Sequence, residues 1–135
     1  MPLMPWTPLF SVGIRAIDEQ HKVLFKLANA FDDAARAGRD GEALERLLDD
    51  LIDYTNFHFE TEERLMERHG YGGEAAHRTE HETLRRSVTE FRERFRGGNI
   101  PPTQDVLTFL RDWLTRHIMN SDRQLGVALG RKGVR

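Results

Sequence analysis

The sequence predicts an all-α protein, an up-down-up-down antiparallel four-helix bundle with an extended N-terminal arm. Apolar residues recur at the helical spacing of three and four over long stretches. Short segments rich in glycine and proline separate these stretches, and links this short make neighbouring helices antiparallel. The length of 135 residues suits one domain with its own core. We therefore expect a single domain over residues 1–135, with the arm at 1–17 and the bundle at 18–130.

The N-terminal arm is expected to be extended and packed along the bundle. Pro2, Pro5 and Pro8 disfavour a helix, because proline lacks the amide hydrogen that a helix interior needs. The arm also carries too many large apolar side chains to remain a free tail. These are Trp6, Leu9, Phe10, Val12, Ile14 and Ile17.

The first two helices have recognisable ends. The first is expected from Asp18, a candidate N-cap, to about Ala37, before residues 38–41 break the pattern with two glycines. The second is expected from about Glu42 to Arg68, where a glycine-rich turn follows.

The third helix is expected from about Glu74 to Arg96. An acidic residue at its start and arginines at its end suit the helix dipole. Residues 97–102 contain two glycines and two prolines and form the next connection. Thr103 is a candidate cap for a fourth helix with one broad apolar face. That face carries Val106, Phe109, Leu110, Trp113, Leu114 and His117.

Composition excludes several classes of function. The chain has 20 basic and 22 acidic residues and a formal net charge of −2, which gives no electrostatic basis for binding nucleic acid. It has no cysteine, which excludes disulfides, thiolate nucleophiles, zinc fingers and cysteine-bound iron–sulfur clusters. Residues 1–10 resemble neither a signal peptide nor a membrane span, so no membrane span and a cytoplasmic location are expected.

Five of the six histidines and two carboxylates form a spaced series that indicates a metal centre. Residues four apart project from one face of a helix, and here they lie on the apolar stripes that face the core. A buried ionisable group costs several kcal/mol unless something satisfies it. A lone His-x-x-x-His pair is more often solvated or satisfied within a core, but seven groups facing one interior favour a shared metal centre. The seven are His21, His58, Glu62, His77, His81, His117 and Asp122.

Two features of this series lead to more detailed expectations. His117 and Asp122 are five residues apart, about 140° on a regular helix, so we expect a π-type turn or a distorted helix end between them. The remaining histidine, His69, lies in a glycine-rich turn and is expected to be solvated.

The number of donors favours two metal ions. Seven side chains exceed the four ligands of a structural zinc site, whereas imidazole and carboxylate together suit iron, zinc, copper or manganese. Two six-coordinate ions offer about twelve positions. Five histidines, two bridging carboxylates and one bridging oxygen fill about eleven, which leaves one position for a diatomic ligand. On a redox-active pair, an imidazole-rich ligand set favours the reduced state and therefore reversible binding over turnover.

The ligand series covers essentially the whole chain and resembles that of the hemerythrin family, with the order His, His-x-x-x-Glu, His-x-x-x-His, His-x-x-x-x-Asp. The N-terminal arm and the chain length resemble those of the bacterial hemerythrins. The resemblance implies an oxo- or hydroxo-bridged, non-haem di-iron centre that binds dioxygen at the iron with fewer histidines. The implied ligands are His77, His81 and His117 for one iron, His21 and His58 for the other, and Glu62 and Asp122 as bridges. Five residues match apolar pocket positions of the family, although core packing is the alternative explanation for each. They are Leu24, Phe59, Trp113, Leu114 and Ile118.

The function expected from the sequence is oxygen transport, storage or delivery by a monomer that is not an enzyme. Dioxygen is the expected ligand, and an oxygen-consuming protein is the expected acceptor. Three alternatives stay open: a sensor of oxygen or redox state that acts through a separate partner, a scavenger of peroxide or nitric oxide, and an iron reservoir. Full recovery of dioxygen on degassing would favour the carrier, and rapid turnover with an electron donor would favour the enzyme.

Overall fold

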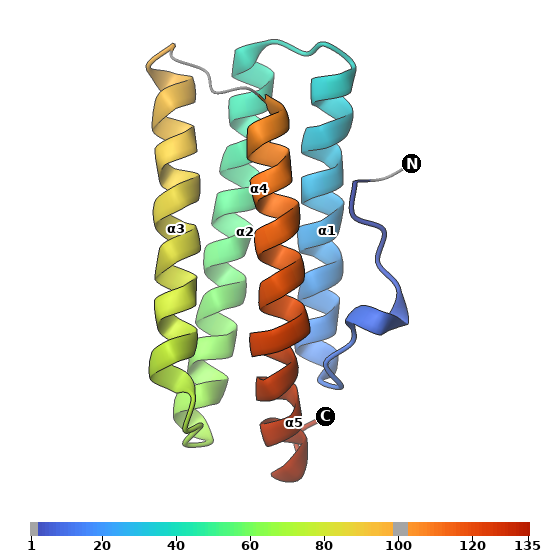
Figure 1. The fold of residues 1–135 in the computed structure, drawn as a ribbon, viewed down its shortest axis with the longest axis vertical. Helices are drawn as coiled ribbons and strands as arrows, with labels where there is room; N and C mark the ends of the chain where they lie inside the picture. Colours follow the sequence, from blue (N-terminus) through green and yellow to red (C-terminus); the bar gives the residue numbers. More distant parts are fainter. Residues whose placement is uncertain (1–2, 99–102) are drawn as a thin grey trace.

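The computed structural model describes residues 3–98 and 103–135, and its helices form the predicted antiparallel up-down-up-down bundle (Figure 1). The fourth helix of the bundle is continuous but contains a π-helical segment, η2, between α4 and α5. The arm carries a short 3-10 helix, η1, and runs beside α1 (Figure 1). The bounds are η1 Pro8–Phe10, α1 Arg15–Arg36, α2 Gly41–Arg68, α3 Glu74–Arg96, α4 Thr103–Arg116, η2 His117–Asp122 and α5 Arg123–Arg131.

The first helix begins three residues earlier than predicted, so the prediction that Asp18 is its N-cap is wrong. Ile14 occupies the cap position and makes no side-chain cap bond. Asp18 lies in the first turn, and its carboxylate accepts hydrogen bonds from the hydroxyl of Ser11 at 2.5 Å and the amide of Val12 at 2.8 Å. The carboxylate therefore fixes the end of the arm onto α1 instead of starting the helix.

The other helix ends agree closely with the sequence pattern. Asp40 caps α2 by accepting a hydrogen bond from the amide of Ala43 at 2.8 Å, so the helix begins at Gly41, one residue before the expected start. The third helix has the expected bounds. The fourth begins at Thr103, but the side chain of Thr103 and residues 99–102 lie outside the described part of the chain.

Polar contacts hold the arm against the bundle. The side-chain amide of Asn29 accepts from the amide of Met4 at 2.7 Å and donates to its carbonyl at 3.0 Å. A guanidinium nitrogen of Arg123 donates to the carbonyl of Leu9 at 2.5 Å. These contacts join the arm to α1 and α5 and complement the apolar side chains of the arm.

The apolar core runs along the bundle and includes the end where α1 and α3 finish and α2 and α4 begin. Phe31 is fully buried there, and its ring meets the edge of Phe95 with 6.3 Å between centroids. The opposite end contains buried polar side chains among its apolar ones. Most of the buried ionisable groups thus lie away from Phe31, although Asp32 beside it is also buried and accepts a hydrogen bond from Arg36 at 3.0 Å.

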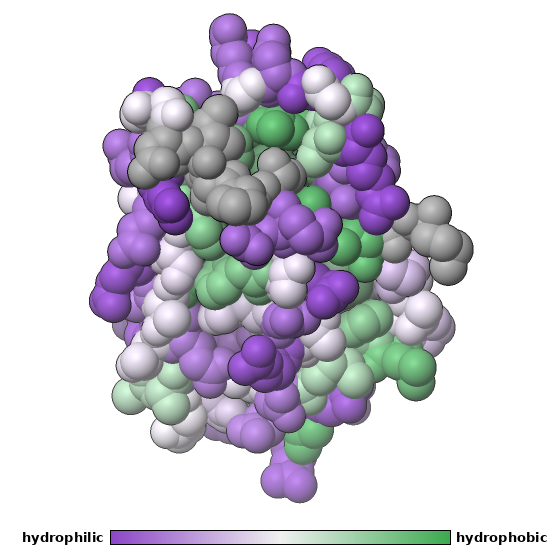
Figure 2. Space-filling view, turned by 45° about the horizontal axis from the view of Figure 1, so that its top comes forward, coloured by the Kyte–Doolittle hydropathy of each residue, from purple (hydrophilic) through white to green (hydrophobic). Residues whose placement is uncertain are grey.

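The surface is largely polar. On the face drawn in Figure 2, hydrophilic side chains surround smaller apolar patches. Among the described residues, the large apolar side chains with high exposure are Leu9, Phe57 and Val127, from the arm, α2 and α5. No described helix has the combination of length and apolar character that a membrane crossing requires.

Close packing between the arm and α5 requires a glycine at position 126. A Cβ atom added to Gly126 would overlap the carbonyl oxygen of Val12 and lie 2.9 Å from its Cβ atom. The backbone of the arm is not free to retreat, because the amide of Val12 is bonded to Asp18. Gly130, one turn later, has open space, with the nearest atom 3.8 Å away on Arg135.

We predict that Gly126→Ala destabilises the protein, whereas Gly130→Ala does not. Alanine is the better helix former by about 1 kcal/mol in a helix interior, so both substitutions favour the helix itself. Only the first forces the arm away, at a cost of roughly 1–3 kcal/mol for overpacking. Thermal and urea unfolding of the two variants measures the difference. Equal stability of the two variants would show that the arm moves freely and that this contact is unimportant.

Candidate metal centre

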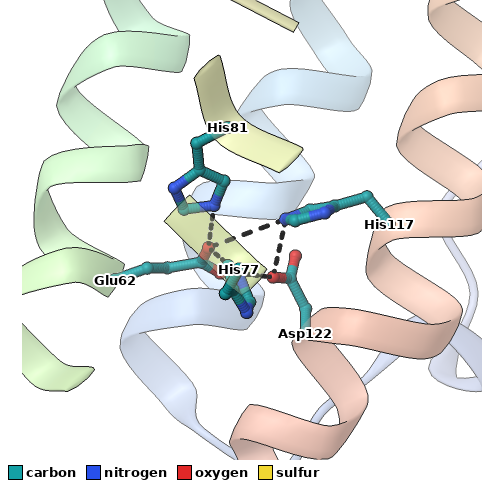
Figure 3. A group of neighbouring side chains, drawn as sticks. All are labelled: Glu62, His77, His81, His117 and Asp122. Atoms are coloured by element: carbon teal, nitrogen blue, oxygen red, sulfur yellow. Dashed lines mark hydrogen bonds and ion pairs between the residues drawn. The ribbon is translucent and has the colours of Figure 1, made fainter. Parts of the chain in front are cut away.

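The seven residues predicted as metal ligands lie together in the interior of the bundle. Each of the four long helices contributes to the cluster, and Figure 3 shows five of its members pointing toward one another. All seven side chains are buried, with exposures between 0% and 4%. The members are His21, His58, Glu62, His77, His81, His117 and Asp122.

The cluster divides into two groups that share their carboxylates. Within each group all donor atoms lie within 4.8 Å of one another. One group comprises Glu62, His77, His81, His117 and Asp122, and the other comprises His21, His58, Glu62 and Asp122. Because both carboxylates belong to both groups, this arrangement suits two ions held side by side with the carboxylates between them.

The distances show that the Nε2 atoms converge on these carboxylates. The Nε2 atoms of His21 and His117 lie 2.9 and 3.0 Å from different oxygens of Asp122. Those of His81 and His58 lie 3.0 and 3.3 Å from different oxygens of Glu62.

Several of these buried nitrogen and oxygen atoms have no hydrogen bond in the described chain, although imidazole nitrogens and carboxylate oxygens lie close together. They include Nε2 of His21, His58 and His117, Oε2 of Glu62, and both carboxylate oxygens of Asp122. Buried donors and acceptors left unpaired are unfavourable, and a cation between them would satisfy nitrogen and oxygen alike. The residues therefore fit a metal centre.

Without a metal ion, neighbouring charges and burial shift pKa values in the cluster in different directions, and burial lowers the pKa of His58. Burial opposes ionisation of Glu62, but the neighbouring histidines, led by His58, hold the pKa of Glu62 well below its usual value. Burial also opposes a charged His77, but hydrogen bonds to Asp122 and Glu62 raise the pKa of His77 to about 9. Burial is likewise outweighed at His117, where Asp122 holds the pKa well above its usual value.

The fourth helix contains the π-type turn expected from the spacing of His117 and Asp122. Residues His117–Asp122 form the π-helical segment η2. The wider turn of a π helix, with hydrogen bonds five residues apart, brings side chains at this spacing onto one face. Nε2 of His117 accordingly lies 3.0 Å from Oδ1 of Asp122. The prediction of a π-type turn is confirmed.

Two of the five predicted pocket residues contact ligand rings. Phe59 stacks on the ring of His81, with 3.7 Å between centroids and 6° between planes. Trp113 stacks on the ring of His117 at 4.5 Å and 20°, and its outer side lines a surface hollow of about 460 Å³. The other three predicted residues are fully buried in the apolar core, with exposures between 1% and 3%. They are Leu24, Leu114 and Ile118.

Three residues that the ligand pattern did not reveal contact the outer nitrogen atoms of ligand histidines. Gln20, Glu63 and Glu80 lie 2.6–2.8 Å from the Nδ1 atoms of three different rings. Each directly adjoins a predicted ligand in the sequence, but this adjacency alone does not distinguish them from polar residues that face solvent. The sixth histidine, His69, ends α2 and belongs to neither donor group.

Comparison with known proteins identifies relatives over nearly the whole chain. The model of the hemerythrin HHE cation binding domain matches residues 12–129. A bacteriohemerythrin of Methylococcus capsulatus is 38% identical over 130 residues, which cover 96% of this chain and 98% of that protein. A bacteriohemerythrin of Pseudomonas aeruginosa is 37% identical over 122 residues, covering 90% and 78%.

Solved structures give the same result. The crystal structure of wild-type hemerythrin superposes with a TM-score of 0.89 at 37% sequence identity, covering 94% of this chain and 98% of that one. A leucine-to-alanine variant of hemerythrin superposes with a TM-score of 0.90 at 36% identity, covering 96% and 98%.

We predict that the metal-free centre releases protons when it binds ferrous iron near neutral pH. With a pKa of about 9, the ring of His77 is protonated at neutral pH, whereas a metal-binding imidazole must present a free nitrogen. Iron affinity should therefore rise with pH up to about 9. Calorimetric titration under nitrogen in two buffers of different ionisation enthalpy measures the protons released, and His69→Ala should release the same number. Equal heats in both buffers would contradict this prediction.

Proposed function

Since the chain belongs to the hemerythrin family, we propose that it binds dioxygen reversibly at a non-haem di-iron centre and thereby transports, stores or delivers dioxygen. The observation that carries this proposal is the pair of buried donor groups joined by Glu62 and Asp122. The predominance of imidazole over carboxylate supports iron that is held in the reduced state and binds its ligand reversibly. We therefore propose a binding protein and not an enzyme, with an oxygen-consuming protein as recipient.

The grouping of the side chains supports a specific ligand assignment. In this proposal the two carboxylates bridge the irons together with an oxo or hydroxo group. The irons, when bound, supply the electrons that reversible dioxygen binding requires. The assignment is His77, His81 and His117 for one iron, His21 and His58 for the other, and Glu62 and Asp122 for the bridge.

The unequal number of histidines favours dioxygen binding on one side. One iron is offered three imidazoles and the other only two, so the exchangeable position is proposed at the iron of His21 and His58. His21 and His58 are 0% and 1% exposed, and this depth removes the site from bulk water. A dry site protects bound dioxygen from the protons that would promote its loss in oxidised form.

Apolar side chains keep the centre dry. Leu24 lies about one helical turn after His21, and Leu114 about one turn before His117, so both lie close to the ligand positions of their helices. Phe59 and Trp113 cover ligand rings directly through their stacking contacts. Together with Ile118, these residues are proposed to form the wall that excludes water from dioxygen.

We predict about two iron atoms per folded chain, with the two bridging residues as the most sensitive positions. Glu62→Ala or Asp122→Ala removes a donor from both groups, whereas a histidine substitution removes a donor from one. Iron content, measured with protein concentration after gel filtration, should fall furthest in the bridging variants. His69→Ala, outside both groups, should keep its iron. One zinc and no iron in the native protein, or equal retention in all seven ligand variants, would refute the assignment.

We predict that Leu114→Ala shortens the lifetime of the oxygenated protein while leaving its iron in place. Leu114 is 3% exposed, so its removal should cost roughly 2–5 kcal/mol of stability and open space that admits water. The measurement is the decay rate of the oxygenated absorption band at equal iron content. Leu110→Ala is a matched control, because Leu110 is equally buried but lies one turn further from the ligands. If the two variants decay at the same rate, Leu114 is ordinary core packing.

A further inference from the structure

A series of hydrogen bonds fixes three of the ligand rings from outside the centre. Nδ1 of His58 contacts Oε1 of Gln20 at 2.6 Å. Nδ1 of His81 contacts Oε2 of Glu63 at 2.8 Å, and Nδ1 of His117 contacts Oε1 of Glu80 at 2.7 Å. A carboxylate or amide oxygen only accepts, so Nδ1 of each ring carries a proton and Nε2 is the atom that would present its lone pair to a bound metal.

These contacts pass from each helix to the next in chain order. Gln20 on α1 supports a ligand on α2, Glu63 on α2 supports a ligand on α3, and Glu80 on α3 supports a ligand on η2. Each supporting residue adjoins a ligand of its own helix in the sequence. Adjacent helical residues point about 100° apart, so when one faces the centre its neighbour faces the seam with the next helix.

The amide of Gln20 has a defined orientation. Its nitrogen donates to the hydroxyl oxygen of Thr61 at 3.2 Å, and that hydroxyl donates to the carbonyl of Phe57 at 3.1 Å. The carbonyl oxygen of Gln20 is therefore the atom directed at His58. The support of this ring is neutral.

The other two supports are carboxylates, and both serve the three-histidine group. Glu63 is 9% exposed and also accepts from Arg78 and Arg85, each at 3.3 Å. Glu80 borders the surface hollow beside His117 and accepts from the hydroxyl of Ser121 at 2.7 Å. In contrast, Nδ1 of His21 in the two-histidine group has no hydrogen-bond partner in the described chain.

We propose that Gln20, Glu63 and Glu80 are positioning residues whose unequal charges make the two metal positions electronically different. The carboxylates Glu63 and Glu80 make two imidazoles of the three-histidine group stronger donors, and this stabilises the oxidised ion there. Neutral Gln20 leaves the two-histidine position poorer in electrons and its ion more readily kept reduced. This inference rests on the proposed di-iron centre.

The charge and the hydrogen bond can be tested separately. Glu63→Gln and Glu80→Gln keep an oxygen acceptor but remove the charge, so the reduction potential of the iron pair should rise. Gln20→Glu adds a charge beside His58, where the Thr61 hydroxyl can turn to donate, so the potential should fall. Glu82→Gln is the matched control, because Glu82 also accepts from Arg85, at 2.5 Å, but contacts no ligand ring. Potentials are measured by anaerobic redox titration at equal iron content.

Alanine variants test positioning. Glu63→Ala and Glu80→Ala remove the acceptor, and loss of such a contact should weaken iron retention roughly 10–100-fold. Retention is read from the rate of iron transfer to a ferrous chelator under nitrogen, and the glutamine variants should largely restore it. Because Glu80 is partly exposed, Glu80→Gln and Glu80→Ala are expected to fold even if changes at Glu63 disturb its arginine contacts.

The outcomes separate this inference from the proposed function. Opposite shifts for Glu80→Gln and Gln20→Glu, with no shift for Glu82→Gln, support the inference even if dioxygen binding is not reversible. Equal potentials in all variants would reduce the three residues to packing and overturn it. A wild-type chain that holds fewer than two iron atoms would overturn the proposed di-iron centre and this inference with it.

Discussion

The burial of seven ionisable side chains between four helices is the constraint on which this structure depends. Each such group would be unfavourable in an apolar interior on its own, so the group must meet opposite charge or a metal ion. Without metal, protonated rings such as His77 face ionised Glu62 and Asp122. With metal, cations take the place of those protons. A cation at the centre would satisfy the buried nitrogen and oxygen atoms that have no hydrogen bond in the described chain, and their side chains already lie close together.

The two ends of the bundle contribute differently to folding and to metal binding. The end that contains Phe31 and Phe95 is mainly apolar, and its buried Asp32 pairs with Arg36. The other end holds the candidate metal centre, and there Ile14 of the arm and Ile17 of α1 join the buried core while Asp18 fixes the backbone of the arm. Packing at the first end can thus hold the four helices in register while the second end positions donors.

The sequence predicted the features that follow from helical periodicity. It did not predict which way polar side chains point where two helices pack together. Helix ends at glycine-rich turns and the members of the donor cluster were accessible because spacing determines which face a residue occupies. Asp18 was misassigned as an N-cap because an aspartate at this position can either cap a helix or bind the backbone of the arm, and the sequence does not distinguish the two. The supports Gln20, Glu63 and Glu80 were invisible because polar residues beside a core stripe normally face solvent. Only the packing of neighbouring helices shows that they face ligands.

The π segment in the fourth helix amounts to one inserted residue, and it divides the helix into two parts with different phase. Leu110 and Leu114 of α4 are buried before the segment, and Leu125, Gly126 and Leu129 of α5 are buried beyond it. Deleting one residue from the segment would restore a regular helix but rotate everything beyond it by about 100°. Either the carboxylate at the centre or the contact surface for the arm would then be lost. Alignments of related chains should therefore place no gap between His117 and Asp122. The extra residue of the π segment affects both the position of Asp122 at the centre and the surface of α5 that contacts the N-terminal arm.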